Sequence, residues 1–299
     1  MRTRSKGPLA GFEWLKRGIG TGYRHPKALF GGAALLLVAG LLPTLILLPV
    51  QFHAQQAGAP ANLSTLGWLM GGSMLVGLLL VPLYAGYLQV LDAAERGLPA
   101  RALDIFKPYR QGEAWRLLGY GLAMILVYVA LFAIINAAAG GGIPSWYVHT
   151  LTAQASHQPP PPLPVGIGSA MALSVVVVIF MMGFYAISLG QIALRQRNVS
   201  GAIGDGMIGA LKNVLPLIVF AVCAILAEIV LLIAFLIAAA MLALIASLVG
   251  GWLVLVLLVP LYIALLLAIF TAMFGVMYYL WRDVCGDGIV TDMAPQIAA

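Results

Sequence analysis

Long apolar runs separated by short polar segments set the pattern of this chain. A helix needs roughly 20 apolar residues to cross the ~30 Å of hydrocarbon in a bilayer, and six runs are long enough. They cover residues 28–50, 66–91, 117–138, 167–193, 214–249 and 252–281. Strands are not expected, because the open edge of a sheet would leave backbone groups unpaired in lipid. The pattern predicts an all-α polytopic membrane helix bundle with six transmembrane helices.

The composition agrees with this interpretation. Hydrophobic residues make up 62% of the 299 residues and charged residues only 9%, which is far from the usage of soluble globular domains. So few charges cannot cover a water-soluble surface. The chain then divides into a basic segment with an interfacial helix at 1–27, a transmembrane domain at 28–281 and a tail at 282–299.

Positive charge falls on one side of the predicted membrane topology. All 16 Lys and Arg residues lie before the first run or after the second, fourth and sixth runs, and the other three connections have none. Loops that keep Lys and Arg near a span stay on the cytoplasmic side during insertion. We therefore expect a multi-pass protein of the bacterial inner (plasma) membrane with both termini in the cytoplasm.

The net charge of +6 is consistent with nucleic-acid binding or with attraction to anionic lipid. Its placement beside the spans favours lipid. We expect the bilayer and anionic phospholipid headgroups as partners, and no nucleic acid. The residues expected to contact these headgroups are Lys16, Arg17, Arg24, Arg110 and Lys212.

Three short segments with apolar residues at helical spacing precede the odd-numbered runs. Their apolar positions are Phe12, Leu15, Ile19 and Tyr23 in the first, Leu103 and Phe106 in the second, and Ile203, Met207 and Leu211 in the third. Amphipathic segments of this kind are typical of helices that lie in the membrane interface. The sequence therefore predicts an interfacial helix ahead of each outward span.

A unit of interfacial helix, outward span and returning span recurs three times in this scheme. The hexapeptide Leu-Leu-Val-Pro-Leu-Tyr at 79–84 returns unchanged at 257–262, and an offset of 101 residues aligns Arg96 with Arg197. The third copy fits less well, because Pro260 lies farther from the end of its span. Two-span units all point the same way, so the pattern predicts three parallel repeats around an axis along the membrane normal.

Pro82, Gly183 and Pro260 occupy similar places in the three returning spans and are candidate helix kinks. Proline removes one backbone hydrogen bond from a helix and bends it. Either a gating hinge or fixed curvature is consistent with these residues, and fixed curvature is favoured.

The connection at 139–166 differs from the other polar segments. It contains three consecutive glycines at 140–142 and four consecutive prolines at 159–162. Such composition favours an extended polyproline segment over a folded domain. We expect a spacer without catalytic function.

Glu228 is the one acidic residue within the six predicted spans. An unpaired charge at this depth costs several kcal/mol, so the side chain must be neutral, paired or hydrated. Two interpretations stay open. Glu228 is either a carboxylate that couples a proton or cation to transport, or a protonated side chain hydrogen-bonded inside the bundle.

No motif predicts a metal or cofactor site. His53, His149 and His157 fall on two different connections, and their spacing is unlike a compact ligand motif. The glycines within 18–22 lack the preceding strand of a phosphate-binding loop. We expect neither a metal nor a cofactor.

Catalysis requires a constellation of acids, bases or nucleophiles, and the spans offer none. The alternative, lipid-modifying chemistry at the cytoplasmic surface, would use Asp92, Glu95 or Asp104. We expect no catalytic residues and a protein that is not an enzyme.

Several short motifs resemble an uncharacterised bacterial family of six-span inner-membrane proteins. They are Gly-Phe-Glu-Trp-Leu-Lys-Arg-Gly at 11–18, Arg-His-Pro at 24–26, Ala-Glu-Arg-Gly at 94–97 and Asp-Ile-Phe at 104–106. More distantly, the repeated plan is similar to the membrane domain attached to some glycerophosphoryl diester phosphodiesterases. The resemblance implies a six-span fold. It does not extend to a phosphodiesterase catalytic domain, so that activity is not implied.

Two functional hypotheses follow from the sequence. The protein passes a small or lipidic solute through its helix bundle, which is slightly favoured because Glu228 is expected to be buried. Alternatively, it is a non-transporting scaffold or assembly factor that acts at the inner leaflet, which the basic interfacial segments favour.

Overall fold

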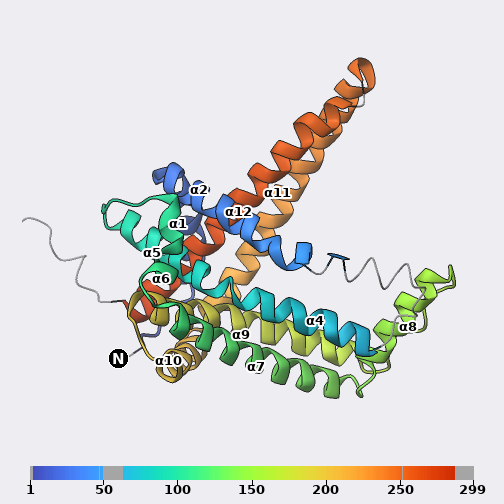
Figure 1. The fold of residues 1–299 in the computed structure, drawn as a ribbon, viewed down its shortest axis with the longest axis horizontal. Coiled ribbons are helices and arrows are strands. Elements are labelled where there is room, and N and C mark those ends of the chain that lie inside the picture. The colour runs from blue at the N-terminus through green and yellow to red at the C-terminus, as the bar shows by residue number, and fades with distance from the viewer. Residues whose placement is uncertain (1–2, 47, 50–62, 251, 287–299) are drawn as a thin grey trace, which may run out of the picture. The chain divides into compact units, whose positions relative to one another are not determined.

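The computed structural model describes residues 3–46, 48–49, 63–250 and 252–286, and within them it confirms the all-α prediction (Figure 1). Six apolar helical stretches are long enough to cross a membrane. They are Pro26–Ile46, Gly67–Glu95, Ala114–Ala138, Ile167–Leu194, Val214–Ser247 and Val256–Cys285. Most of the first connection, including His53, and the tail from residue 287 lie outside the described residues. The chain is a multi-pass membrane protein built from helices.

The helices are named in chain order. They are α1 (Ala10–Arg24), α2 (Pro26–Gly40), α4 (Leu63–Leu78), α5 (Val81–Glu95), the 3-10 helix η1 (Ala102–Phe106), α6 (Lys107–Arg110), α7 (Ala114–Ala138), α8 (Ile143–Ala155), α9 (Ile167–Leu194), α10 (Val199–Lys212), α11 (Val214–Val249) and α12 (Trp252–Cys285).

Two compact units share the chain. Unit 1 consists of Met1–Ala34, Ala85–Ile105 and Ile179–Ala299, and unit 2 consists of Leu35–Tyr84 and Phe106–Val178. Unit 1 thus joins three segments that are far apart in the sequence. It contains α1, the latter parts of α5 and α9, and all of α10, α11 and α12.

Unit 1 has its core where the last turns of α5, α9 and α12 meet. The largest fully buried side chains of these three helices are Tyr87, Leu88, Leu91, Phe184, Tyr278, Tyr279 and Trp281. Asp92, Glu95, Gln191, Tyr278, Tyr279 and Asp283, described below, also lie in these last turns. We call this region the basic end of the returning spans.

Polar side chains tie the three helices together at the basic end. The Gln89 amide of α5 donates a hydrogen bond to the Ala193 carbonyl of α9, over 3.1 Å. The Trp281 indole of α12 lies 3.4 Å from the Gln191 amide oxygen of α9. Each pair of returning spans is joined in this way, because α12 also reaches α5 through the tyrosines described below.

The first predicted interfacial segment is α1, which packs against α11 and α12 through its small residues. A Cβ added to Gly11 would lie 2.1 Å from the carbonyl oxygen of Pro216. At Gly18 it would lie 2.7 Å from the backbone nitrogen of Val276. Only glycine allows backbones to approach this closely, so the glycines fix where α1 lies.

The third predicted segment is α10, which packs on α9, also through glycines. Gly206 faces the Phe184 carbonyl oxygen, 2.9 Å from an added Cβ, and Gly209 faces the end of the Ile187 side chain at 2.6 Å. The second segment is shorter, with η1 followed by α6. Its buried residue Ile105 lies on α5, and a Cβ at Gly86 would be 2.0 Å from the Ile105 carbonyl oxygen.

These contacts follow one order around unit 1. Two of the interfacial segments lie against the returning span that precedes them in the sequence, η1 on α5 and α10 on α9. The first segment, α1, has no preceding span and lies on the last one, α12. The N-terminal helix therefore contacts the C-terminal span. The threefold repeat itself stays a prediction.

Bulky apolar side chains of α1 and α10 remain uncovered by the protein. On α1 the exposed fractions are 48% for Phe12, 45% for Ile19 and 84% for Tyr23. On α10, Met207 and Leu211 are likewise exposed. The stripe predicted to meet the membrane is thus distinct from the small-residue face that packs on the spans.

The three candidate kinks have different surroundings. The second span is interrupted at residues 79–80, so that Pro82 lies in the first turn of α5, where its missing N–H costs little. The Tyr109 hydroxyl donates to the Leu79 carbonyl left free by the interruption. Pro260, in contrast, lies inside the continuous helix α12.

Gly183 lies within the continuous helix α9, where an added Cβ would be 2.4 Å from the Leu217 side chain. This glycine therefore allows α11 to pack closely on α9.

The connection after α7 contains a helix that the sequence did not predict, α8. The Trp146 indole of α8 donates to the Pro161 carbonyl, over 3.3 Å, while residues 158–164 have no regular secondary structure. The extended proline segment thus lies back on α8.

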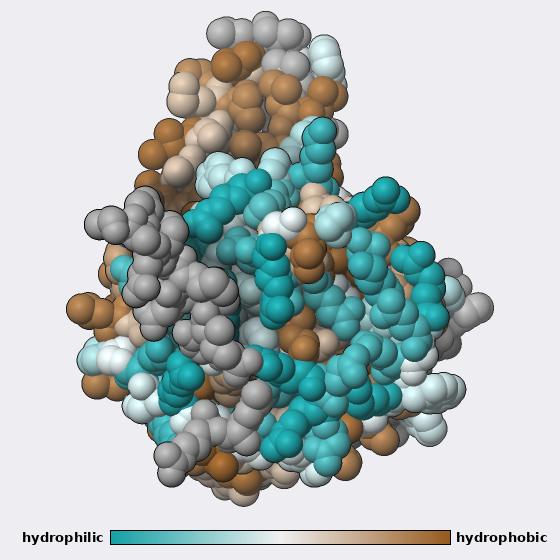
Figure 2. Space-filling view, turned by 90° about the vertical axis from the view of Figure 1, so that its left-hand side faces the viewer, coloured by the Kyte–Doolittle hydropathy of each residue, from teal (hydrophilic) through white to brown (hydrophobic). Residues whose placement is uncertain are grey.

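Helices α11 and α12 form a long hairpin (Figure 1). With 36 and 34 residues and a rise of ~1.5 Å per residue, they are about 50 Å long, more than the ~30 Å of bilayer hydrocarbon. Hydrophobic side chains cover the hairpin (Figure 2). Most of them are exposed from Val222 to Ile263, whereas Leu217 and Phe274 near the basic end are buried.

Candidate functional site

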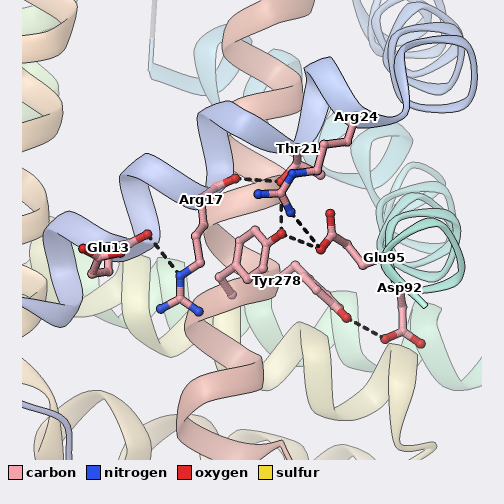
Figure 3. Close-up of polar contacts among 8 residues, drawn as sticks. Glu13, Arg17, Thr21, Arg24, Asp92, Glu95 and Tyr278 are labelled. Carbon is pink, nitrogen blue, oxygen red and sulfur yellow. Dashed lines mark hydrogen bonds and ion pairs between the residues drawn. The ribbon is translucent and has the colours of Figure 1, made fainter. Parts of the chain in front are cut away.

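Two acids of α5 lie one turn apart at the basic end and face two tyrosines of α12 (Figure 3). The Tyr278 hydroxyl donates to Asp92 Oδ1 over 3.0 Å, and the Tyr279 hydroxyl donates to Glu95 Oε2 over 2.6 Å. A spacing of three residues puts both carboxylates on one face of the helix. Adjacent tyrosines in α12 can therefore reach both of them.

Arginines pair with both acids. Arg96 Nε lies 2.9 Å from Asp92 Oδ1, and the negative charge of Asp92 raises the pKa of the Arg96 guanidinium above its ordinary value. Arg24 of α1 approaches Glu95 less closely, with 3.7 Å between Nη1 and Oε2. Both arginine side chains are more than half exposed.

The end of α12 holds α1 through Asp283. Arg17 Nη2 lies 2.9 Å from Asp283 Oδ2, and the Trp14 indole donates to the same oxygen over 3.0 Å. The Arg17 guanidinium also lies over the ring of Tyr279, 5.2 Å from its centroid, a favourable cation–π geometry. These contacts align α1 along α12.

A second set of contacts joins α9 and α10. The buried Gln191 amide donates to Asp205 Oδ2 over 2.8 Å, and Arg197 Nε lies 3.2 Å from the same oxygen. The Asn198 side chain caps α10 by accepting from the Gly201 backbone N–H, a preferred N-cap arrangement.

The N-terminal residues lie along the junction of α10 and α11. The Lys212 ammonium donates to the Thr3 carbonyl and hydroxyl oxygens, both at 3.2 Å. The Asn213 side chain accepts from the Lys6 backbone N–H and donates to the Arg4 carbonyl. The start of the chain is therefore fixed to residues more than 200 positions away.

One polar atom of the network is left without a partner. The Glu95 side chain is 7% exposed, and its second oxygen, Oε1, is buried with no hydrogen-bond partner among the described residues. Figure 3 shows this oxygen pointing away from the groups that bind Oε2. Buried carboxylate oxygens are normally satisfied, and Glu95 Oε1 lacks such a donor among the described residues.

The residues expected to contact anionic headgroups are used in different ways. Lys16 and Arg110 are exposed, and Arg17, Arg24 and Lys212 take part in the internal contacts described above. The structure thus draws Arg17, Arg24 and Lys212 into the protein's own network, and the lipid contacts stay a prediction.

Glu228 is not part of this network. It lies on α11 with an exposed side chain, and the structure gives it no hydrogen bond or ion pair within the residues it describes. Its two interpretations, coupling carboxylate or hydrogen-bonded structural acid, stay predictions.

Sequence reasoning did not find the tyrosine–carboxylate pairs. Asp92 and Glu95 were considered only for surface chemistry, and Tyr278 and Tyr279 were included in an apolar span. The available signal was weak: two acids three residues apart at the end of one span, and two tyrosines just before the basic end of another.

The carboxylates of the basic end act as hydrogen-bond and ion-pair acceptors. Within the described residues, no group of three His, Cys, Asp or Glu side chains is placed to hold a metal ion. The carboxylates of the network accept from hydroxyl, indole, amide and guanidinium donors. Such contacts hold the helices together and leave the guanidinium groups of Arg24 and Arg96 exposed.

Comparison with protein-family models, with curated proteins and with solved structures found no match to this chain. The resemblance to six-span inner-membrane proteins and to the membrane domain of phosphodiesterases therefore stays a prediction.

Proposed function

We propose that this membrane protein is a scaffold that acts at the inner leaflet of a bacterial plasma membrane, with α1 and α10 lying among the lipid headgroups. One observation carries the proposal. Both helices pack on the spans with small residues and leave a stripe of bulky apolar side chains uncovered. On a helix that lies in the membrane interface, lipid covers such a stripe.

The contacts at the basic end support a fixed platform. Hydrogen bonds join α5, α9 and α12 in pairs, and an ion pair holds α1 on α12. Many of these contacts would have to break together for one helix to move past another. A rigid base suits a scaffold better than an element that rocks during transport.

The orientation in this proposal comes from charge placement. Every Lys and Arg lies at the same side of the predicted topology, and each basic residue near an anionic leaflet contributes about 1 kcal/mol to binding. Lys16 is exposed on α1 next to the apolar stripe, which supports such a contact.

The depth of α1 in the membrane tests the proposal. A nitroxide label is attached to Ile19→Cys, in the apolar stripe, or to Gly20→Cys, about 100° away on the same helix, after replacing Cys223 and Cys285 by Ala. In proteoliposomes we expect the label at 19 to be accessible to oxygen and shielded from a water-soluble nickel chelate. The label at 20 should be accessible to the chelate. Equal access of the chelate to both labels would remove the proposal.

A second candidate, passage of a small or lipidic solute, is favoured by Glu228, an acid in an otherwise apolar helix. The slight preference for transport required this residue to be buried, whereas its side chain is exposed. Proteoliposomes with the wild-type chain or Glu228→Gln decide the matter. A proton or solute flux that the substitution abolishes supports transport, and the absence of flux from both proteins speaks against it.

A further inference from the structure

Glu95 is an acceptor that the protein does not complete. Its side chain is 93% buried by the surrounding helices, and one carboxylate oxygen is satisfied while the other has no donor among the described residues. Leaving a buried charged acceptor unpaired is costly. An additional donor, carried by a molecule outside the chain, would remove that cost.

Arg24 is the complementary feature beside it. At 3.7 Å from Glu95 Oε2, its guanidinium is too distant for a hydrogen bond, and 57% of its side chain is exposed. Its N–H groups are therefore available to an anion that arrives from the membrane surface. A buried acceptor and an accessible cation thus lie next to each other.

We propose that Glu95 and Arg24 bind the headgroup of a zwitterionic phospholipid that carries a primary ammonium group. The ammonium donates a hydrogen bond to Glu95 Oε1, and the phosphate accepts from the Arg24 guanidinium. The proposal rests on the proposed function in one respect, that the basic end lies among lipid headgroups. It adds which lipid class is selected there.

The surrounding charges explain why both halves of the headgroup are needed. The Arg24 guanidinium lies 3.7 Å from Glu95 Oε2, so a cation alone would meet its positive charge near Glu95. The phosphate of the same headgroup compensates by facing Arg24. A purely anionic headgroup lacks the donor that Oε1 requires.

A quaternary ammonium provides the sharpest comparison. Phosphatidylcholine and phosphatidylethanolamine share the phosphate, but the trimethylammonium group of phosphatidylcholine has no N–H to donate. Selection that depends on Glu95 Oε1 must therefore distinguish the two lipids, whereas attraction by charge alone does not.

The experiment uses the full-length chain, purified and delipidated in detergent. Binding of phosphatidylethanolamine and of phosphatidylcholine with equal acyl chains is measured by native mass spectrometry. We expect phosphatidylethanolamine to bind roughly tenfold more tightly, the effect of one charge-assisted hydrogen bond. Glu95→Gln and Arg24→Gln should each remove most of this preference. Glu13→Gln on α1 changes the same charge outside the proposed site and should preserve it.

Each remaining outcome counts against the proposal. Equal binding of the two lipids by the wild-type chain overturns it, as does a preference that survives in Glu95→Gln or in Arg24→Gln. Arg24 is exposed, so its variant is expected to fold even if Glu95→Gln does not.

Competition by soluble phosphoethanolamine at the same concentration as the lipid would show that the ligand is not a lipid, and would also overturn the proposal. The proposed function fails by a different measurement, the depth of the label at residue 19. The two failures are therefore distinguishable.

Discussion

Helices α1 and α10 both pack on the spans through small residues, but the ion pairs that hold them have opposite polarity. Each turns its small residues toward a returning span and leaves bulky apolar side chains exposed. On α1 the helix supplies the cation, Arg17, and the span supplies the acid, Asp283. On α10 the helix supplies the acid, Asp205, and the segment after the span supplies the cation, Arg197.

This reversal indicates that small residues at the contact are required, whereas the sign of the charge on each partner is interchangeable. Close approach of two backbones requires a residue without a side chain at the point of contact, and both helices have one. The ion pairs are partly exposed and contribute modestly, so either partner can be the cation. We therefore expect glycine substitutions to have larger effects than charge substitutions.

The largest effect is expected from Gly18→Leu on α1. A Cβ at residue 18 would lie 2.7 Å from the Val276 nitrogen and 2.9 Å from the Ala272 oxygen, two backbone atoms that cannot easily move aside. We expect a loss of about 2–3 kcal/mol in unfolding free energy, seen as a lower Tm in detergent. Gly20→Leu is the matched control, since its nearest neighbour is the flexible end of Arg24 at 3.9 Å. Equal Tm values for the two variants would contradict this packing.

A smaller loss is expected from Gly209→Leu on α10. The nearest atoms to a Cβ at residue 209 belong to the side chains of Ile187 and Val284, which can adjust. We expect a loss of about 1–2 kcal/mol. Gly204→Leu is the control on the same helix, because a Cβ there meets nothing within 4 Å. If Gly209→Leu lowers Tm more than Gly18→Leu, the distinction between backbone and side-chain obstacles is wrong.

The charge reversal predicts effects of similar size on the two helices. Asp283→Asn on α12 and Asp205→Asn on α10 each weaken one ion pair, and we expect each to lower the unfolding free energy by about 1 kcal/mol. Because both arginines are partly exposed, high salt should narrow the difference from the wild-type chain. Thermal unfolding at low and high salt checks this, and a salt-independent difference would show that hydrogen bonds rather than charge dominate.

The smallest effect on folding is expected for Lys16→Gln on α1. The side chain is exposed, so the unfolding free energy in detergent should change by less than about 0.5 kcal/mol. Binding of anionic lipid to the same variant should weaken by about 1 kcal/mol, which native mass spectrometry can measure. A loss of stability without a change in lipid binding would place Lys16 in the internal network instead.

The repeated hexapeptide shows that the same local sequence can adopt different helical structures. At 79–84 the second span is interrupted. There the Tyr109 hydroxyl donates a hydrogen bond to the Leu79 carbonyl. At 257–262 the same six residues continue within α12. Identical letters predict that proline perturbs both helices. The surroundings decide whether the helix is interrupted.

The sequence alone determined that six helices are long enough to span a membrane, because an apolar run of sufficient length is a local property of the chain. It also determined that α1 and α10 are amphipathic helices beside the spans. Charge placement predicts their side of the membrane for the same reason.

Only the tertiary structure decided which face of α1 packs and which acids are buried. The apolar stripe of Phe12, Ile19 and Tyr23 was the stronger local signal, yet the opposite face makes the contact. There Gly11 and Gly18 meet the backbones of α11 and α12, and the buried Trp14 indole donates to Asp283. The pairing of α5 acids with α12 tyrosines joins residues more than 180 positions apart. Contacts of that separation depend on how the helices pack, which no local pattern encodes.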